Sequence, residues 1–269
     1  SERIVRFIRK RPVGNIYAVV IGVNKYLNVP SLRYAVGDAK AFADFLTGHL
    51  GVPNKNVTML LDEKVTLRSL RTTLGVTLRK AAGPKDTVII YYAGHGGTEP
   101  DDQDRDGDGL EKYLLPHDAD PEALFGTAMS MGGLQSVFRR IRSERLVFIA
   151  DACYSGAVGG RTILSSRRAT VSDQFMNRLS KGKGRIILSA AGANQVAQED
   201  EKLGHGVFTY YLIKALKGAG DRDGDGYVTV DEAYDYVSKA VPKATGQSQT
   251  PVRKGTSVGQ LYLGRVKAN

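Results

Sequence analysis

The fold of this chain is decided by the stretch Thr87-Val88-Ile89-Ile90-Tyr91-Tyr92-Ala93-Gly94-His95-Gly96-Gly97. A second stretch repeats its organisation and reads Leu146-Val147-Phe148-Ile149-Ala150-Asp151-Ala152-Cys153-Tyr154-Ser155-Gly156. In both, an apolar run typical of a buried parallel strand leads into a turn that contains glycine. Active sites of open α/β sheets form at the carboxyl ends of such strands. We therefore expect His95 and Cys153, the one cysteine of the chain, at the same sheet edge.

Strand patterns alternate with helical patterns along the rest of the chain. We predict strands at residues 16–23, 57–61, 87–92, 146–150, 185–190 and 260–263, and helices at residues 35–47, 67–82, 131–141, 207–216 and 230–241. This alternation predicts an α/β fold built on a doubly wound, mainly parallel sheet of six strands. A basic tail over residues 1–13 precedes a single expected domain over residues 14–264.

Composition bounds the class of protein. Hydrophobic residues make up 42% and charged residues 25% of the 269 residues, which is ordinary for a globular chain. One cysteine excludes an internal disulfide, and no apolar run is long enough to cross a membrane. The net charge of +10 gathers in the tail and around residues 161–185, so we expect a solvated surface and no nucleic-acid partner. These features slightly favour the cytoplasm, with a secreted or periplasmic location open if a leader has been removed.

The histidine and the cysteine suit nucleophilic catalysis. A thiolate is a strong nucleophile, and a neighbouring imidazole takes its proton and later protonates the leaving group. The glycines beside both residues allow close approach of a substrate, and the N–H groups of Gly96 and Cys153 suit a tetrahedral oxyanion. The alternative is a buried structural cysteine beside a turn histidine.

These motifs resemble the caspase-like cysteine peptidases, specifically the metacaspases and their bacterial orthocaspase branch. The resemblance extends to Leu32–Ala39, Leu188–Ala191 and Gly206–Leu212, and covers residues 14 to 264. It implies a three-layer α/β/α sandwich. It also implies a large-subunit-like part over residues 14–160, a mobile linker over residues 157–184 and a small-subunit-like part over residues 185–264.

The resemblance assigns roles by position. His95 becomes the general base and acid, and Cys153 the nucleophile. Asp38 and Asp151 match two carboxylates of the S1 pocket, which implies substrates with Arg or Lys before the scissile bond. Position 93 is alanine where some metacaspases carry a serine, so the choice between Arg and Lys stays open. Without the resemblance, Asp38 reads as a carboxylate that stabilises a helix N-terminus.

Residues 221–232 match the twelve-residue EF-hand calcium loop. Its ligands are expected from the side chains or carbonyls of Asp221, Asp223, Asp225, Tyr227, Thr229 and Glu232. A second acidic loop has only the first half of the pattern and contains Asp102, Asp104, Asp106 and Asp108. It is a partial calcium site, completed by Glu111 or Asp118, or an acidic loop near the cleft. Because metacaspases often depend on Ca²⁺, we expect calcium to order the substrate cleft.

The basic loop after the cysteine offers further predictions. In the resembled family such loops are often cleaved by the enzyme itself, and Arg167 and Arg168 are the candidate positions. A flexible solubilising loop is the alternative. The leading prediction is thus a calcium-dependent cysteine endopeptidase, acting as a monomer on protein or peptide substrates. An inactive caspase-like scaffold or a calcium-sensing interaction module is the competing class.

Overall fold

The main sheet of the protein contains five parallel strands and one antiparallel edge strand. The computed structural model describes residues 14–100, 109–153, 176–177, 179–182, 184–192 and 195–266. Across the sheet the order is β11-β7-β6-β3-β1-β2. The parallel strands are β1 (Ile16–Gly22), β2 (Val57–Leu61), β3 (Thr87–Pro100), β6 (Arg145–Cys153) and β7 (Arg185–Ser189), and β11 (Val252–Thr256) runs antiparallel to β7. The predicted α/β fold with a mainly parallel six-stranded sheet is confirmed.

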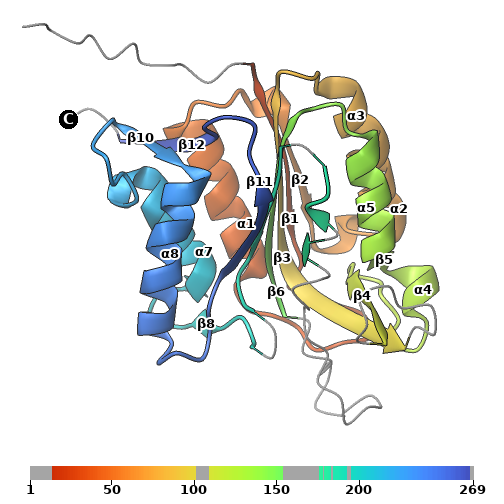
Figure 1. Ribbon diagram of the computed structural model, residues 1–269. Helices are drawn as coiled ribbons and strands as arrows, with labels where there is room; N and C mark the ends of the chain where they lie inside the picture. The colour runs from red at the N-terminus through yellow and green to blue at the C-terminus, as the bar shows by residue number, and fades with distance from the viewer. Residues whose placement is uncertain are drawn as a thin grey trace, which may run out of the picture.

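Helices cover both faces of this sheet and complete three layers (Figure 1). One face carries α1 (Ala35–Asp44), α7 (Val207–Lys214) and α8 (Val230–Ala244), and the other carries α2 (Leu67–Thr72), α3 (Leu78–Ala81) and α5 (Met131–Arg140). Successive strand residues point to opposite faces, so Ile89 and Tyr91 join one buried cluster while Ile90 and Tyr92 join the other. Each helical layer therefore has its own hydrophobic core against the shared sheet.

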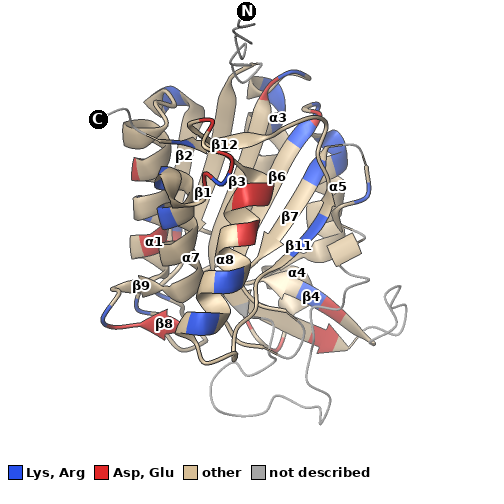
Figure 2. Cartoon of the chain, turned by 60° about the vertical axis from the view of Figure 1, so that its left-hand side comes forward, with Lys and Arg blue, Asp and Glu red and all other residues tan. Residues whose placement is uncertain are grey.

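The predicted helices are present, but three of them include π-helical segments. The segments are Phe45–His49 after α1, Thr73–Thr77 between α2 and α3, and Ala215–Ala219 after α7. Helix α8 begins with a capping box, in which Thr229 and Glu232 exchange hydrogen bonds between side chain and backbone. Figure 2 shows acidic residues near the start of α8 and basic residues towards its end, an arrangement that complements the helix dipole.

Strand β3 is longer than the sequence pattern indicates. We expected it to end at Tyr92, but it continues to Pro100. It pairs with β6 as far as His95, and from Gly96 onwards it pairs with β4 (Leu110–Leu114), which also pairs with β5 (Met129–Ser130). The His-Gly motif is therefore not a turn after a strand. It lies where one continuous strand exchanges its partner.

The sixth strand of the sheet is also not the predicted one. The strand predicted at residues 260–263 is β12 (Tyr262–Arg265), which pairs with β10 (Tyr227–Thr229) in a separate small sheet. The sheet edge is formed instead by β11, whose sequence Val-Arg-Lys-Gly-Thr has no alternation of apolar and polar residues. Because an edge strand is only half covered, its composition gives no pattern that identifies it.

Several predictions fall outside the described residues. They are the basic tail over residues 1–13, the acidic positions Asp102, Asp104, Asp106 and Asp108, and the self-cleavage candidates Arg167 and Arg168. The division into subunit-like parts stays a prediction. In the part of the chain that the structure describes, no helix has the length and apolar character needed to cross a membrane.

Candidate active site

The sheet register places the two motif residues side by side. His95 of β3 and Cys153 of β6 are Cα partners in the parallel pairing of these strands. Neighbouring strands lie about 4.8 Å apart, so the two backbones are in direct contact. For Cys153 the structure describes the backbone alone. The apolar runs that precede each residue are what bring them to the same edge of the sheet.

His95 is held by two tyrosines and a carbonyl. The His95 amide donates to Tyr26 Oη at 2.7 Å, and the centroids of the His95 and Tyr26 rings lie 4.9 Å apart. Tyr92 Oη donates to the His95 carbonyl at 2.7 Å. His95 Nε2 lies 2.9 Å from the carbonyl oxygen of Pro30. Because a carbonyl only accepts, Nε2 carries the proton and Nδ1 is left as the basic nitrogen. Burial lowers the pKa of His95, which keeps the imidazole neutral near pH 7.

A cleft of about 280 Å³ opens beside His95. Its lining includes Asp38, Asp151 and Gly96, which the sequence predicted for the site, together with Glu199 and Gly206, which it did not. These residues come from α1, β6, β3, β8 (Glu199–Asp200) and β9 (His205–Gly206). The structure thus brings Asp38 and Asp151 together with His95 although they are far apart in the sequence.

The two aspartates are buried and directed at one point. Asp38 is 2% exposed and Asp151 is 9% exposed. A Cβ atom on Gly206 would lie 2.9 Å from Oδ2 of each aspartate, so Gly206 leaves the space between them open. Gly206 has an ordinary backbone conformation, with φ of −60° and ψ of 133°, so space rather than conformation calls for glycine here.

Each carboxylate is fixed by its own hydrogen bonds. Asp38 Oδ2 accepts from the Gly206 amide at 2.9 Å, and Asp38 Oδ1 contacts His205 Nδ1. Both partners lie in β9, so this carboxylate is directed at β9 and not at the amides of α1. Asp151 Oδ2 accepts from Thr209 Oγ1 at 2.6 Å. Since Thr209 uses its proton on Asp151, the 2.6 Å contact between Tyr91 Oη and Thr209 Oγ1 has the tyrosine as donor.

The electrostatics of this pair disfavour two bare charges. Burial raises the pKa of Asp38 to about 7. Burial, and then repulsion from Asp38, raise the pKa of Asp151 to about 7. Glu199 adds a third negative group nearby, and its carboxylate accepts from the amides of Arg33 and Tyr34 ahead of α1. A cation placed between the aspartates would favour their ionised forms.

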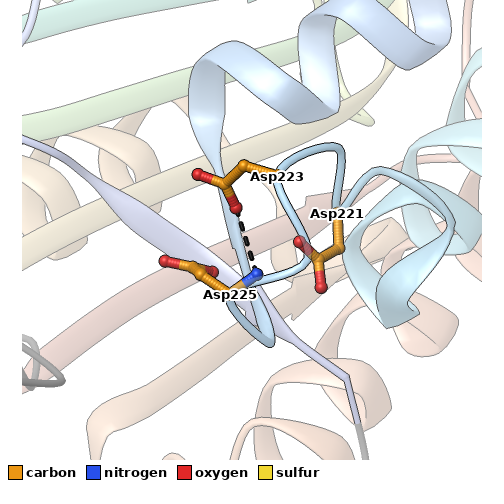
Figure 3. A group of neighbouring side chains, drawn as sticks. All are labelled: Asp221, Asp223 and Asp225. Atoms are coloured by element: carbon orange, nitrogen blue, oxygen red, sulfur yellow. Dashed lines mark hydrogen bonds between the residues drawn. The ribbon is translucent and has the colours of Figure 1, made fainter. Parts of the chain in front are cut away.

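The loop over residues 221–232 adopts a compact turn rich in carboxylates. One oxygen each of Asp221, Asp223 and Asp225 lie within 4.8 Å of one another. Figure 3 shows the three side chains on one loop, with Asp223 Oδ1 accepting from the Asp225 amide at 3.1 Å. Gly224 and Gly226 have φ values of 73° and 84°, which allow the loop to turn back on itself. Oxygen ligands at this spacing fit a hard divalent cation such as Ca²⁺.

The other expected ligands of this loop are nearby but differently engaged. Glu232 Oε2 accepts from the amide and the hydroxyl of Thr229, both at 2.9 Å, so Glu232 caps α8. Burial alone would raise the pKa of Glu232, but hydrogen bonds from Thr229 and from the Arg222 amide lower it. The loop is separated from Gly206 by the 207–219 helical segment, which is roughly 20 Å long. From the sequence we expect calcium to act on the cleft through this helix, and the loop lies at the end of the helical segment away from Gly206.

The two residues proposed to complete the second acidic loop differ in their surroundings. Glu111 Oε1 accepts from the amides of Met131 and Gly132, so this carboxylate caps the start of α5. Asp118, the other candidate, is exposed.

The comparisons with known proteins agree with this fold. The family model described as "Caspase domain" matches residues 16–262, and the chain belongs to this family. The structure of protein GSU0716 from Geobacter sulfurreducens is similar in fold, with a TM-score of 0.60 and 19% identity, and covers 90% of this chain and 94% of that one.

Curated relatives include fungal metacaspases. Metacaspase-1A of Aspergillus oryzae is 26% identical over 192 residues, which is 67% of this chain and 43% of the relative. Metacaspase-1A of Aspergillus terreus is 27% identical over 225 residues, which is 79% of this chain and 52% of the relative. The chain thus spans about half the length of the curated relatives it matches. It is a caspase-family homologue of the metacaspases.

Proposed function

We propose that the protein is a cysteine endopeptidase in which Cys153 is the nucleophile and His95 the general base. His95 Nδ1 takes the thiol proton, and the Cys153 thiolate attacks the scissile carbonyl carbon. The amides of Gly96 and Cys153 stabilise the oxyanion, and His95 returns the proton to the leaving amine. Water then hydrolyses the acyl-enzyme. The pairing of His95 with Cys153 in the sheet register supports these roles.

We further propose that the substrate carries Arg or Lys before the scissile bond. The observation that carries this proposal is the pair of buried carboxylates, Asp38 and Asp151, whose Oδ2 atoms flank the space above Gly206. A cationic side chain would compensate both charges, whereas an acidic one would add repulsion to a site with Glu199 already beside it. Specificity for a basic residue follows from charge and from the two fixed acceptors.

Calcium dependence is the second part of the proposal. Asp221, Asp223 and Asp225 would hold the ion with the Tyr227 carbonyl, and Thr229 and Glu232 would complete the shell. The ion would neutralise three neighbouring carboxylates and fix the loop between α7 and α8. Gly206 lines the pocket and directly precedes α7. An ion that orders the other end of this helical segment would therefore also stabilise the pocket.

Hydrolysis of fluorogenic peptides tests both parts. Peptides ending in Arg, Lys or Asp are compared with millimolar-range calcium and with excess chelator, using the parent protein, Cys153→Ala and Asp223→Asn. We expect cleavage after Arg or Lys in calcium, none with Cys153→Ala, and a higher calcium requirement with Asp223→Asn. Cleavage after Asp would overturn the assignment of the pocket, and equal rates with chelator would overturn the role of calcium.

Self-cleavage at Arg167 or Arg168 follows from this specificity, because both are basic residues in the loop after the nucleophile. Mass spectrometry after incubation with calcium identifies the new termini. A chain that stays intact in active enzyme would contradict the proposal. A monomeric state is proposed from the similarity to the metacaspases.

A further inference from the structure

His205 contacts the pocket from behind Asp38. It lies in β9, directly before Gly206, and its Nδ1 is 2.5 Å from Asp38 Oδ1. The side chain of His205 is 29% exposed, whereas that of Asp38 is 3% exposed. The imidazole thus reaches from the surface to a buried carboxylate.

Two consecutive residues hold both oxygens of Asp38. His205 binds Oδ1, and the Gly206 amide donates to Oδ2. Because an ionised carboxylate only accepts, His205 Nδ1 carries the proton of this hydrogen bond. With both oxygens engaged, the plane of the Asp38 carboxylate is fixed relative to β9.

This fixed plane decides where Asp38 Oδ2 is directed. It faces the space beside Gly206 that Asp151 Oδ2 also faces, and Asp151 Oδ2 is itself held by the hydroxyl of Thr209. Without His205, Asp38 would keep one hydrogen bond and could rotate about its side chain. The pocket would keep its charge but lose the orientation of one of its two acceptors.

Orientation matters unequally for the two basic side chains. A guanidinium group is planar and presents its N–H donors in a rigid fork, so it requires acceptors at matched positions. An ammonium group is a compact point charge that adapts to acceptors in many directions. We propose that His205 is a positioning residue that orients Asp38 and thereby favours arginine over lysine in the pocket. The inference rests on the proposed specificity for basic residues.

Steady-state kinetics on paired Arg and Lys peptides test this role. We expect His205→Ala to raise KM about 10-fold for the Arg peptide, the effect of losing a charged hydrogen bond, and less than about 3-fold for the Lys peptide. His205→Asn places an amide N–H near the position of Nδ1 and should restore the preference for Arg. His49→Ala is the matched control, because His49 binds the Arg265 carbonyl at the far end of α1.

If His205 had only a structural role, His205→Ala would raise KM equally for the Arg and the Lys peptide, and that result would overturn the inference. So would His205→Asn behaving like His205→Ala while both variants keep their thermal unfolding temperature. If the parent enzyme cleaves neither peptide, the proposed specificity fails by itself. The inference is then decided by NMR titrations that measure the affinity of the Cys153→Ala protein for agmatine, which carries a guanidinium group, and for butylamine, which carries an ammonium group. Equal affinities of agmatine with and without His205→Ala would refute it.

Discussion

Replacement of Asp151 by asparagine is expected to stabilise the protein, by an amount that grows as the pH rises from about 4 to about 8. The substitution keeps the shape of the side chain and keeps an oxygen that accepts from Thr209. It removes one buried charge from a pair whose members repel each other. Since the pair is proposed to bind a cation that is absent from the free enzyme, its charges are a cost to folding until substrate arrives.

The magnitude follows from the shifted pKa. Burial and the neighbouring Asp38 raise the pKa of Asp151 from 3.8 to about 7. At 1.36 kcal/mol per unit this is an upper limit of about 4 kcal/mol, and sharing of the repulsion with Asp38 leaves roughly 2–4 kcal/mol. For a chain of this size that corresponds to roughly 4–8 °C in the unfolding temperature.

The sign depends on which state binds more protons. Between pH 4 and pH 7 the folded protein keeps Asp151 protonated while the unfolded chain has released the proton. Stability of the parent protein therefore falls as pH rises through this window, and asparagine has no such loss. The advantage of Asp151→Asn is absent at pH 4, grows through pH 5 to 7, and is complete at pH 8.

Thermal unfolding by circular dichroism at pH 5 and pH 8 measures this difference. Both proteins carry Cys153→Ala, so that self-cleavage is excluded, and calcium is held constant. Asp44→Asn serves as control because Asp44 lies exposed at the end of the same helix, α1, as Asp38. A gain that is equal at both pH values, or a loss at pH 8, would refute the reasoning.

Three further predictions concern activity. The KM for Arg peptides should fall as pH rises from 5.5 to 8, because the raised pKa values of Asp38 and Asp151 leave the pair partly protonated at the lower pH; a flat KM profile would contradict this. Gly206→Ala should fold with an unchanged circular dichroism spectrum but lower kcat/KM for Arg peptides at least about 100-fold, since its Cβ enters the space between the carboxylates. Tyr26→Phe removes the acceptor of the His95 amide and should lower kcat roughly 10-fold with KM unchanged, as single-turnover kinetics can verify.

The core of the site follows from local sequence patterns. The apolar runs before His95 and Cys153 are visible in the sequence, and the carboxyl ends of neighbouring parallel strands necessarily lie side by side. The alternate spacing of Asp221, Asp223 and Asp225 within a twelve-residue loop is likewise local, and the loop folds with the three carboxylates together. Asp38 and Asp151 could be named only through the resemblance to a family.

Other residues of the site give no recognisable pattern in the sequence. Glu199, His205 and Thr209 lie in segments whose local pattern indicates a loop and the start of a helix, with nothing to connect them to a pocket. Gly206 looks like a residue that precedes a helix, and its backbone angles would suit any side chain. Its requirement for glycine arises from two carboxylates that other segments of the chain bring to it.

The sequence by itself determined the alternation of strands and helices, the edge shared by His95 and Cys153, and the acidic loop, because each depends on periodicity or spacing over a few residues. The tertiary structure alone decided that β11 forms the edge strand beside β7 and that α1 and α7 pack on the same face of the sheet. That packing brings Asp38 to Gly206 across 168 residues of sequence and buries the aspartates. Burial and approach of charges are properties of packed elements, so the electrostatics of the pocket exist only in the folded chain.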